Sequence, residues 1–145
     1  MNRTVLAISA IAIGVTAVAA QSDPIAARRE LMKGIGGQTK TGVAMAKGEA
    51  PYDQAKAQAI FASYIDAAAK APGLFPPTSK TGGDTAALPA IWDNKADFEA
   101  KFAKLSADAK QAQANVKDAD TFKTVFPQVT KDCGSCHETY RAKKS

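Results

Sequence analysis

Apolar residues recur every three or four positions through most of the chain beyond residue 20, a spacing typical of amphipathic helices. The pattern predicts four helices, at about residues 24–47, 52–70, 94–116 and 118–143. Ser22-Asp23-Pro24 combines capping side chains with a proline suited to a first turn, so the first helix begins there. Gly48 and Pro51 end it.

A segment rich in proline and glycine, residues 71–92, separates the second helix from the third. The other two connections are short, and this combination suits an antiparallel four-helix bundle. The sequence therefore predicts an all-α fold in which four antiparallel helices surround one core. Pro127 lies inside the last helix, where we expect a kink or a break because proline has no amide hydrogen.

The last helix carries an apolar stripe with distinctive chemistry. At about 100° per residue, one face of this helix collects Phe122, Phe126, Val129, Cys133, Cys136, His137 and Tyr140. Within it, Cys133-Gly134-Ser135-Cys136-His137 matches C-x-x-C-H, the attachment motif of a c-type haem. Two thiols bond to the vinyl groups of the macrocycle, and the adjacent imidazole binds the iron. We therefore expect the bundle to enclose one haem c, attached covalently through Cys133 and Cys136, with His137 as an iron ligand.

Other interpretations of the cysteine pair carry less weight. The chain has two cysteines and one histidine, all within this motif, which leaves too few ligands for a zinc site of about four. A redox-active disulfide would be expected beside a β-α-β pattern, whereas this region is helical. A structural disulfide between Cys133 and Cys136 would close a very short loop and gain little stability.

The first twenty residues have the features of an export signal. Asn2-Arg3 supplies positive charge, residues 5–18 form a short apolar run, and small residues precede Gln21. An uncleaved membrane anchor is the alternative, although the apolar run is short for a span. We expect removal of residues 1–20, leaving residues 21–145 as one cytochrome domain in the periplasm without a stable membrane anchor.

Charge and composition narrow the function further. The formal net charge is +5, and loss of Arg3 and addition of two haem propionates would reduce it to about +2. This modest charge argues against binding to nucleic acid. No second histidine and no recognisable acid–base pair accompany the motif, so we do not expect an enzyme.

The chain has no second histidine, so three possibilities remain for the second axial position of the iron: a methionine, a lysine or no ligand from the protein. Met32 and Met45 remain after removal of the signal, about 140° apart around the first helix, so both cannot face the same core. The inner stripe of that helix comprises Ile25, Arg28, Met32, Ile35, Gly36, Thr39 and Val43. Without a haem, Met32 would be a gap-filling core residue. Beside a haem, with no other soft ligand on the stripe, we expect it to bind the iron.

The same helix contains Gly34, Gly36, Gly37 and Gly42. Glycine weakens a helix by roughly 1 kcal/mol relative to alanine. Either the helix is irregular here, or the glycines permit close approach to the macrocycle.

Together these features resemble the class II c-type cytochromes, the cytochrome c-prime family. The resemblance spans the mature chain and rests on Arg28 with Met32, residues 47–52, Ile91-Trp92, and the C-x-x-C-H motif followed by Arg141. It implies that Arg28 and Arg141 lie near the haem propionates and that Trp92 either packs ordinarily or contacts the haem edge or its loop. In most of the family the residue matching Met32 is apolar, and a five-coordinate, high-spin haem binds nitric oxide or carbon monoxide. Leu31-Met32-Lys33 is similar instead to the low-spin branch.

The predicted function is therefore one-electron transport by a low-spin haem with histidine and methionine ligands, a pair that raises the reduction potential. A gas-binding protein with a five-coordinate haem is the main alternative, and a structural module with an incidental disulfide is a third. The expected partners are periplasmic redox proteins, and the family resemblance also allows a homodimer. A cluster of cations near the haem would steer an acidic partner, unless it is simply a solvated tail: Lys131, Arg141, Lys143 and Lys144.

Overall fold

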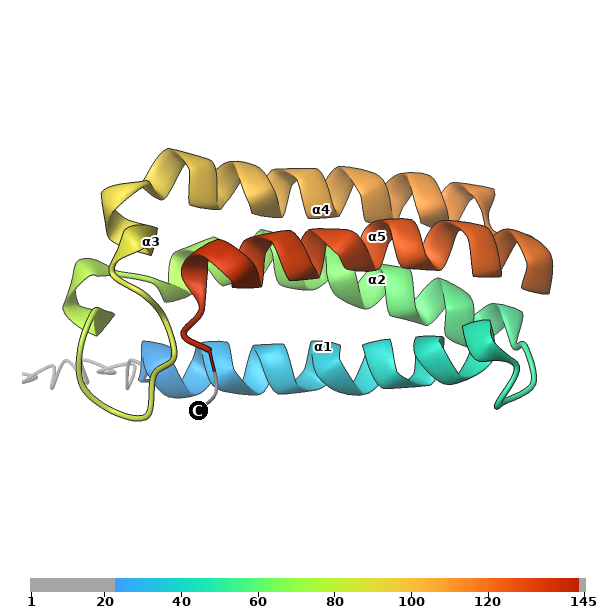
Figure 1. Cartoon of the computed structure of the whole chain (residues 1–145), viewed down its shortest axis with the longest axis horizontal. Coiled ribbons are helices and arrows are strands. Elements are labelled where there is room, and N and C mark those ends of the chain that lie inside the picture. Colours follow the sequence, from blue (N-terminus) through green and yellow to red (C-terminus); the bar gives the residue numbers. More distant parts are fainter. Residues whose placement is uncertain (1–22, 144–145) are drawn as a thin grey trace, which may run out of the picture.

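The computed structural model describes residues 23–143. Four long helices lie side by side as an antiparallel bundle (Figure 1), which confirms the predicted all-α fold. They are α1 (Pro24–Lys47), α2 (Gln54–Lys70), α4 (Lys95–Asn115) and α5 (Ala119–Tyr140). The crossover contains three short helices, η1 (Ala71–Leu74), η2 (Pro77–Ser79) and α3 (Ala90–Asp93). The predicted export signal lies outside the described residues.

Local sequence accounts for the helix ends. The Asp23 carboxylate accepts a hydrogen bond from the amide of Ile25 and caps α1, with Pro24 as its first residue. Gly48 ends α1 in the left-handed region at φ 76°, where glycine is favoured. A reciprocal capping box between Asp118 and Thr121 starts α5.

We expected a kink or a break at Pro127, and the break is wrong. One unbroken helix, α5, runs from Ala119 to Tyr140 with Pro127 inside it. Pro127 and Lys123, four residues earlier, both lie on the exposed face. Water can therefore bond to the carbonyl group that proline leaves without its usual amide partner.

The core is built from aromatic side chains along the bundle axis. Near the α1–α2 connection, Phe61 and Phe122 are fully buried, and the ring of Phe122 stacks on Phe126 with centroids 5.0 Å apart. Near the crossover, Phe98 makes edge contacts with Phe75, Phe102 and Tyr140. Among residues 23–143, none of the helices combines the length and hydrophobicity needed to cross a bilayer.

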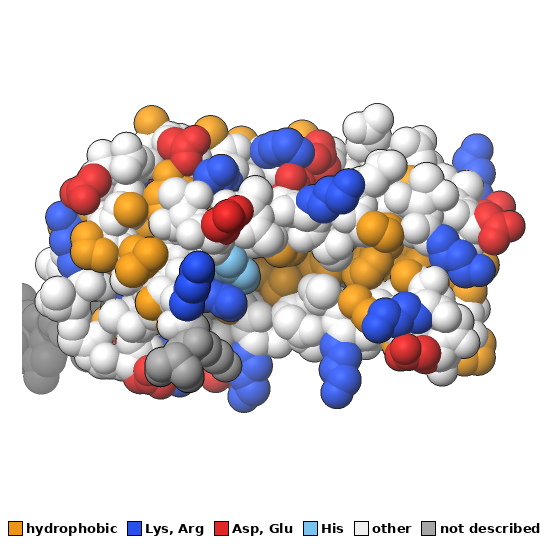
Figure 2. Space-filling view, viewed as in Figure 1, with side chains coloured by type: hydrophobic (Ala, Val, Ile, Leu, Met, Phe, Trp, Pro, Cys, Tyr) orange, Lys and Arg blue, Asp and Glu red, His pale blue; other side chains and the backbone are white. Residues whose placement is uncertain are grey.

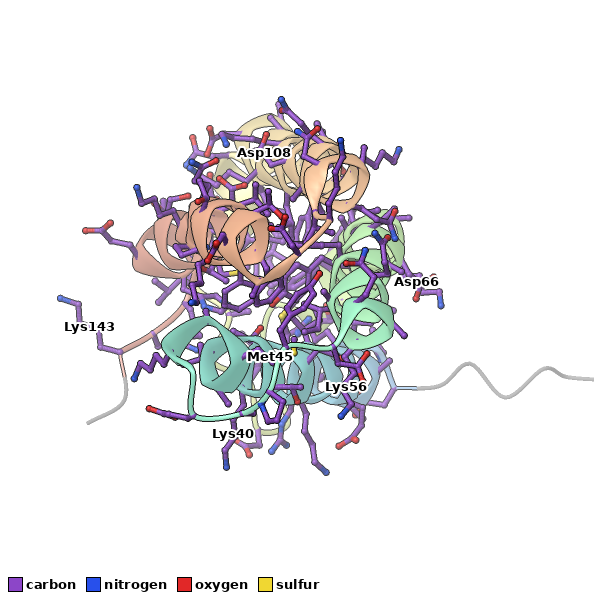
Figure 3. The ribbon with its side chains drawn as sticks, turned by 90° about the vertical axis from the view of Figure 1, so that its right-hand side faces the viewer. Lys40, Met45, Lys56, Asp66, Asp108 and Lys143 are labelled. Carbon is purple, nitrogen blue, oxygen red and sulfur yellow. The ribbon has the colours of Figure 1, made fainter. Side chains whose placement is uncertain are left out.

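The expectation that only one methionine of α1 faces the core is wrong. Met45 is buried in the core, with 4% of its surface exposed, and Met32 packs against the same core. Figure 3 shows Met45 inside the bundle, whereas Lys40 projects outward. The reason is that α1 contacts both α2 and α5, so it is buried over a wider arc than a single stripe.

Candidate haem site

A cavity of about 540 Å³ lies between α1, α4, α5 and the crossover. Its volume falls within the roughly 300–1,000 Å³ typical of small-molecule and cofactor sites. Apolar side chains dominate its wall: Ile35, Phe75, Ile91, Phe98, Phe102 and Leu105. Figure 2 shows histidine, in pale blue, beside a hollow floored by hydrophobic side chains.

The C-x-x-C-H motif occupies the last turns of α5 and faces this cavity. Cys133, Cys136 and His137 are half-buried, and all three line it. Both cysteines are free thiols. Their spacing of three residues, with the histidine four residues after Cys133, places all three on one side of the helix. The structure therefore brings the predicted attachment residues and the predicted iron ligand to one wall.

Burial sets the protonation of these groups. It raises the pKa of the thiols of Cys133 and Cys136, and so favours their neutral forms in the protein chain. Burial, assisted by the positive charge of Arg141, lowers the pKa of His137. The imidazole is thus favoured in its neutral form, which is the form that binds metals.

Met32 lines the same cavity from α1 and is half-buried. Met45 belongs to the core at the other end of α1 and is not part of the cavity wall. The lysines of the wall are Lys33 and Lys101. Lys33 is exposed and lies 3.6 Å from Glu30 in an ion pair. Met32, the soft iron ligand predicted from the sequence, is therefore the methionine that lines the cavity.

Arg28 is a buried cation on the cavity wall, with 4% of its surface exposed. Its guanidinium donates hydrogen bonds to the carbonyl of Leu74, to the carbonyl and hydroxyl of Ser79, and to the hydroxyl of Thr85. It also lies 4.7 Å from the centroid of the Phe75 ring. None of these partners carries a negative charge, so the buried guanidinium suits a nearby anionic group.

Arg141 lies at the mouth of the cavity, where the chain leaves α5. An isolated antiparallel bridge pairs Ala87 with Arg141. The amide of Leu88 donates to the carbonyl of Tyr140 at 3.0 Å, and the amide of Ala142 donates to the carbonyl of Ala86 at 2.8 Å. This bridge fixes part of the crossover against the end of α5. The crossover residues that it holds, Ala86 and Ala87, line the cavity.

Trp92 is half-buried and does not line the cavity. Its indole nitrogen donates to the carbonyls of Phe75 and Pro76, at 3.0 and 3.3 Å. Trp92 also packs against the hydrophobic core, so the structure agrees both with ordinary packing and with contact to the crossover loop.

Two acidic residues at or beside the cavity were not predicted from the sequence, Asp132 and Asp97. Asp132 is buried on the cavity wall next to Cys133. The hydroxyl of buried Tyr140 donates to the carboxylate of Asp97, an interaction that raises the pKa of Tyr140 to about 12. The ion pair of Asp132 with Lys104 and the hydrogen bond of Tyr140 with Asp97 both join α5 to α4. Nothing in the local sequence signals which residues of two distant helices will meet.

The residues present fit a covalently attached haem. The cavity is apolar, two free thiols and a neutral imidazole line one wall, and a thioether lines another. The buried guanidinium of Arg28 could balance a haem carboxylate. These residues supply attachment, iron ligands and charge compensation within one cavity.

Comparison with known proteins agrees with this assignment. The family model described as Cytochrome C' matches residues 23–141. A cytochrome c' from Rhodopseudomonas palustris is 48% identical over 135 residues, covering 93% of this chain and 92% of that protein. A cytochrome c-556 from the same organism is 34% identical over 148 residues, covering 99% of each. The solved structure of a Rhodopseudomonas palustris cytochrome c' matches with a TM-score of 0.84 at 50% identity, covering 86% of this chain and 100% of that one.

Proposed function

The chain belongs to the cytochrome c' family, and we propose that it is a one-electron carrier whose haem iron is bound by His137 and Met32. Its cofactor is one covalently attached haem c per chain. The observation that carries the proposal is that Met32 of α1 and His137 of α5 line one cavity, whereas Met45 does not. The relatives named cytochrome c-556 add support.

The haem supplies a reversible ferric–ferrous couple, and the protein chain sets its environment. Cys133 and Cys136 would hold the edge of the macrocycle, and His137 would present a neutral imidazole. The aromatic wall would shield one side of the haem from water, which tunes the reduction potential. Arg28 and Arg141, which line the same cavity, would pair with the propionates. With both His137 and Met32 bound to the iron, its coordination would stay unchanged between oxidation states, so electron transfer would need little reorganisation.

We assign this electron transfer to the periplasm, with residues 1–20 as the export signal. The basis is the apolar, small-residue pattern of that segment. Periplasmic redox proteins are the proposed partners, and electron transport rather than catalysis is the proposed role.

Gas binding at an open iron site is the second candidate. It is favoured by the higher identity to the relative named cytochrome c', 48%, than to the cytochrome c-556 from the same organism, 34%. In this alternative Met32 would line the cavity as an ordinary apolar side chain, leaving the iron five-coordinate and high-spin.

Optical and magnetic spectra of the purified holoprotein separate the two candidates. We expect a low-spin ferric spectrum with the weak far-red charge-transfer band of a methionine–iron bond. Met32→Leu should abolish that band, convert the protein to high spin and permit rapid binding of carbon monoxide. Met45→Leu is the matched control, since it changes a methionine of the same helix outside the cavity, and it should alter neither property. A wild-type protein that is high-spin at neutral pH would overturn the electron-carrier assignment in favour of gas binding.

A further inference from the structure

Asp132 is a buried carboxylate on the wall of the cavity, and only one of its two oxygens has a hydrogen-bond partner. Its side chain is 10% exposed, and its Oδ1 accepts a hydrogen bond from Nζ of Lys104 at 2.8 Å. Its Oδ2 is buried and has no hydrogen-bond partner among the described residues. Buried carboxylates normally have both oxygens hydrogen-bonded. The unpaired oxygen of Asp132 therefore calls for a physical explanation.

The partner of Asp132 does not neutralise it fully. Lys104 also binds Asp108, so one cation is shared by two carboxylates, and with all three groups ionised the cluster has one negative charge in excess. The side chain of Lys104 is 61% exposed, and water therefore screens its charge. The charge of Asp132 instead acts through the protein interior, where the effective dielectric constant is lower.

The other charges of the cavity wall differ from Asp132 in sign or in exposure. The cations are Arg28, Arg29, Lys33, Lys101 and Arg141. Glu30 is the other acid of the wall, and its side chain is 74% exposed. Among the described residues of the wall, Asp132 is therefore the buried anion.

We propose that the carboxylate of Asp132 lowers the reduction potential of this cytochrome by stabilising its oxidised form. The inference rests on the haem site proposed above. The oxidised protein carries one more positive charge at the haem than the reduced protein, and a nearby buried anion stabilises that charge. Reduction adds one electron from the redox partner, and the effect needs no proton transfer.

The first test is Asp132→Asn, which removes the charge and preserves the shape of the side chain. We expect the midpoint potential of the holoprotein to rise, with a three- to tenfold change in the electron-transfer equilibrium against a mediator of fixed potential. For one electron this corresponds to about 30–60 mV. The spin state and the axial-ligand bands should match those of the wild type.

A second variant separates the charge of Asp132 from its role in packing. Lys104→Met removes the shared cation, leaves both carboxylates in place and changes a largely exposed side chain. If the charge acts on the haem, this variant should lower the potential, opposite to Asp132→Asn and by a smaller amount, because the charge of Lys104 is partly screened by water. A contact that merely holds α4 to α5 would be broken by either change, and both potentials would then shift in the same direction. Asp120→Asn is the control, because that carboxylate is 95% exposed at the start of α5, and it should leave the potential unchanged.

Shifts of the same sign for Asp132→Asn and Lys104→Met would overturn the proposal. So would a potential of Asp132→Asn that equals that of Asp120→Asn. Failure of the methionine-ligand assignment is recognised separately, from the spin state of the wild type. In that case the sign of the two shifts would still decide the role of Asp132, because both are measured on the covalently attached haem.

Discussion

A Cβ atom placed on Gly42 of α1 would lie only 2.3 Å from Cε2 of Phe126 in α5. The two helices thus approach so closely that the ring packs against bare backbone. No atom lies within 4 Å of the corresponding position at Gly34, Gly36 or Gly37. Of the two explanations for these glycines, irregularity is wrong because α1 is continuous. The close approach that the structure shows is between Gly42 and the side chain of Phe126 in the core.

This difference predicts opposite effects for two glycine substitutions in one helix. Gly42→Ala should destabilise the holoprotein by about 1–3 kcal/mol, because the methyl group displaces a buried ring. Gly37→Ala should stabilise it by about 0.5–1 kcal/mol, since alanine favours the helix and meets open space. Guanidinium unfolding of both variants measures the two changes. Equal effects at the two positions would contradict the contact with Phe126.

Covalent attachment predicts that the haem stays with the chain when the protein is denatured. Acid–acetone extraction of the wild type should leave the colour with the protein, because thioether bonds survive it. Cys133→Ala and Cys136→Ala should each retain at most one thioether and yield much less holoprotein, as measured by mass spectrometry and haem staining. Ser135→Ala, between the two cysteines, is the control and should attach haem normally. Colour that leaves the wild type with the solvent would refute the attachment site.

Tyr64 predicts a loss of stability at alkaline pH. Its side chain is fully buried in α2, its hydroxyl shares a 2.8 Å hydrogen bond with Thr39, and burial raises its pKa to about 12. An unfolded tyrosine titrates near pH 10, so the folded state holds this proton more tightly. The contribution is fully present below pH 10 and is lost as the pH rises toward 12, by about 2–3 kcal/mol.

Tyr64→Phe removes the titrating group, so the free energy of unfolding should fall less between pH 10 and 12 than in the wild type. Thr39→Val is the control, because it removes the hydrogen bond and keeps the phenol, so the fall should persist. Denaturant titrations at several pH values measure both slopes. Identical slopes for the wild type and Tyr64→Phe would show that Tyr64 does not control alkaline stability.

Sequence periodicity is enough to predict the features that depend on a single helix. The caps at Asp23 and Gly48 and the grouping of Cys133 with His137 follow from local chemistry and from 3.6 residues per turn. The burial of Met45 does not, because it depends on α1 being covered by two neighbouring helices. The partners of Arg28 are equally inaccessible to local reasoning, since Thr85 is 57 residues away and meets it through the path of the crossover.

The incomplete hydrogen bonding of the Asp132 carboxylate also depends on the tertiary arrangement. Its contact with Lys104 depends on the register of α5 against α4, 28 residues apart in the chain. Sequence patterns predict which face of a helix is apolar, and the partners of a buried charge come only from the tertiary arrangement. The chemistry of the site was therefore predictable, whereas its electrostatic environment was not.

The cationic end of α5 predicts how the protein meets its redox partner. Arg141 lies at the cavity mouth, and Figure 3 shows Lys143 projecting into solvent; Lys144 lies outside the described residues. Positive charge near the haem would accelerate encounter with an anionic redox protein, and salt would screen that attraction. The second-order rate of electron exchange should therefore fall as ionic strength rises.

Reversing the charges of Lys143 and Lys144 to glutamate should slow this exchange at low salt and flatten its dependence on ionic strength. Lys40→Glu with Lys110→Glu is the matched control, because it changes the net charge equally at exposed positions outside the cavity wall. Stopped-flow kinetics with one anionic partner at low and high salt compares the two double variants. The effect should be larger for the pair that follows Arg141 in the chain, since steering depends on where the charge lies as well as on its sum. Equal effects of the two pairs would show that only net charge matters, and a rate insensitive to salt and to both changes would place docking elsewhere.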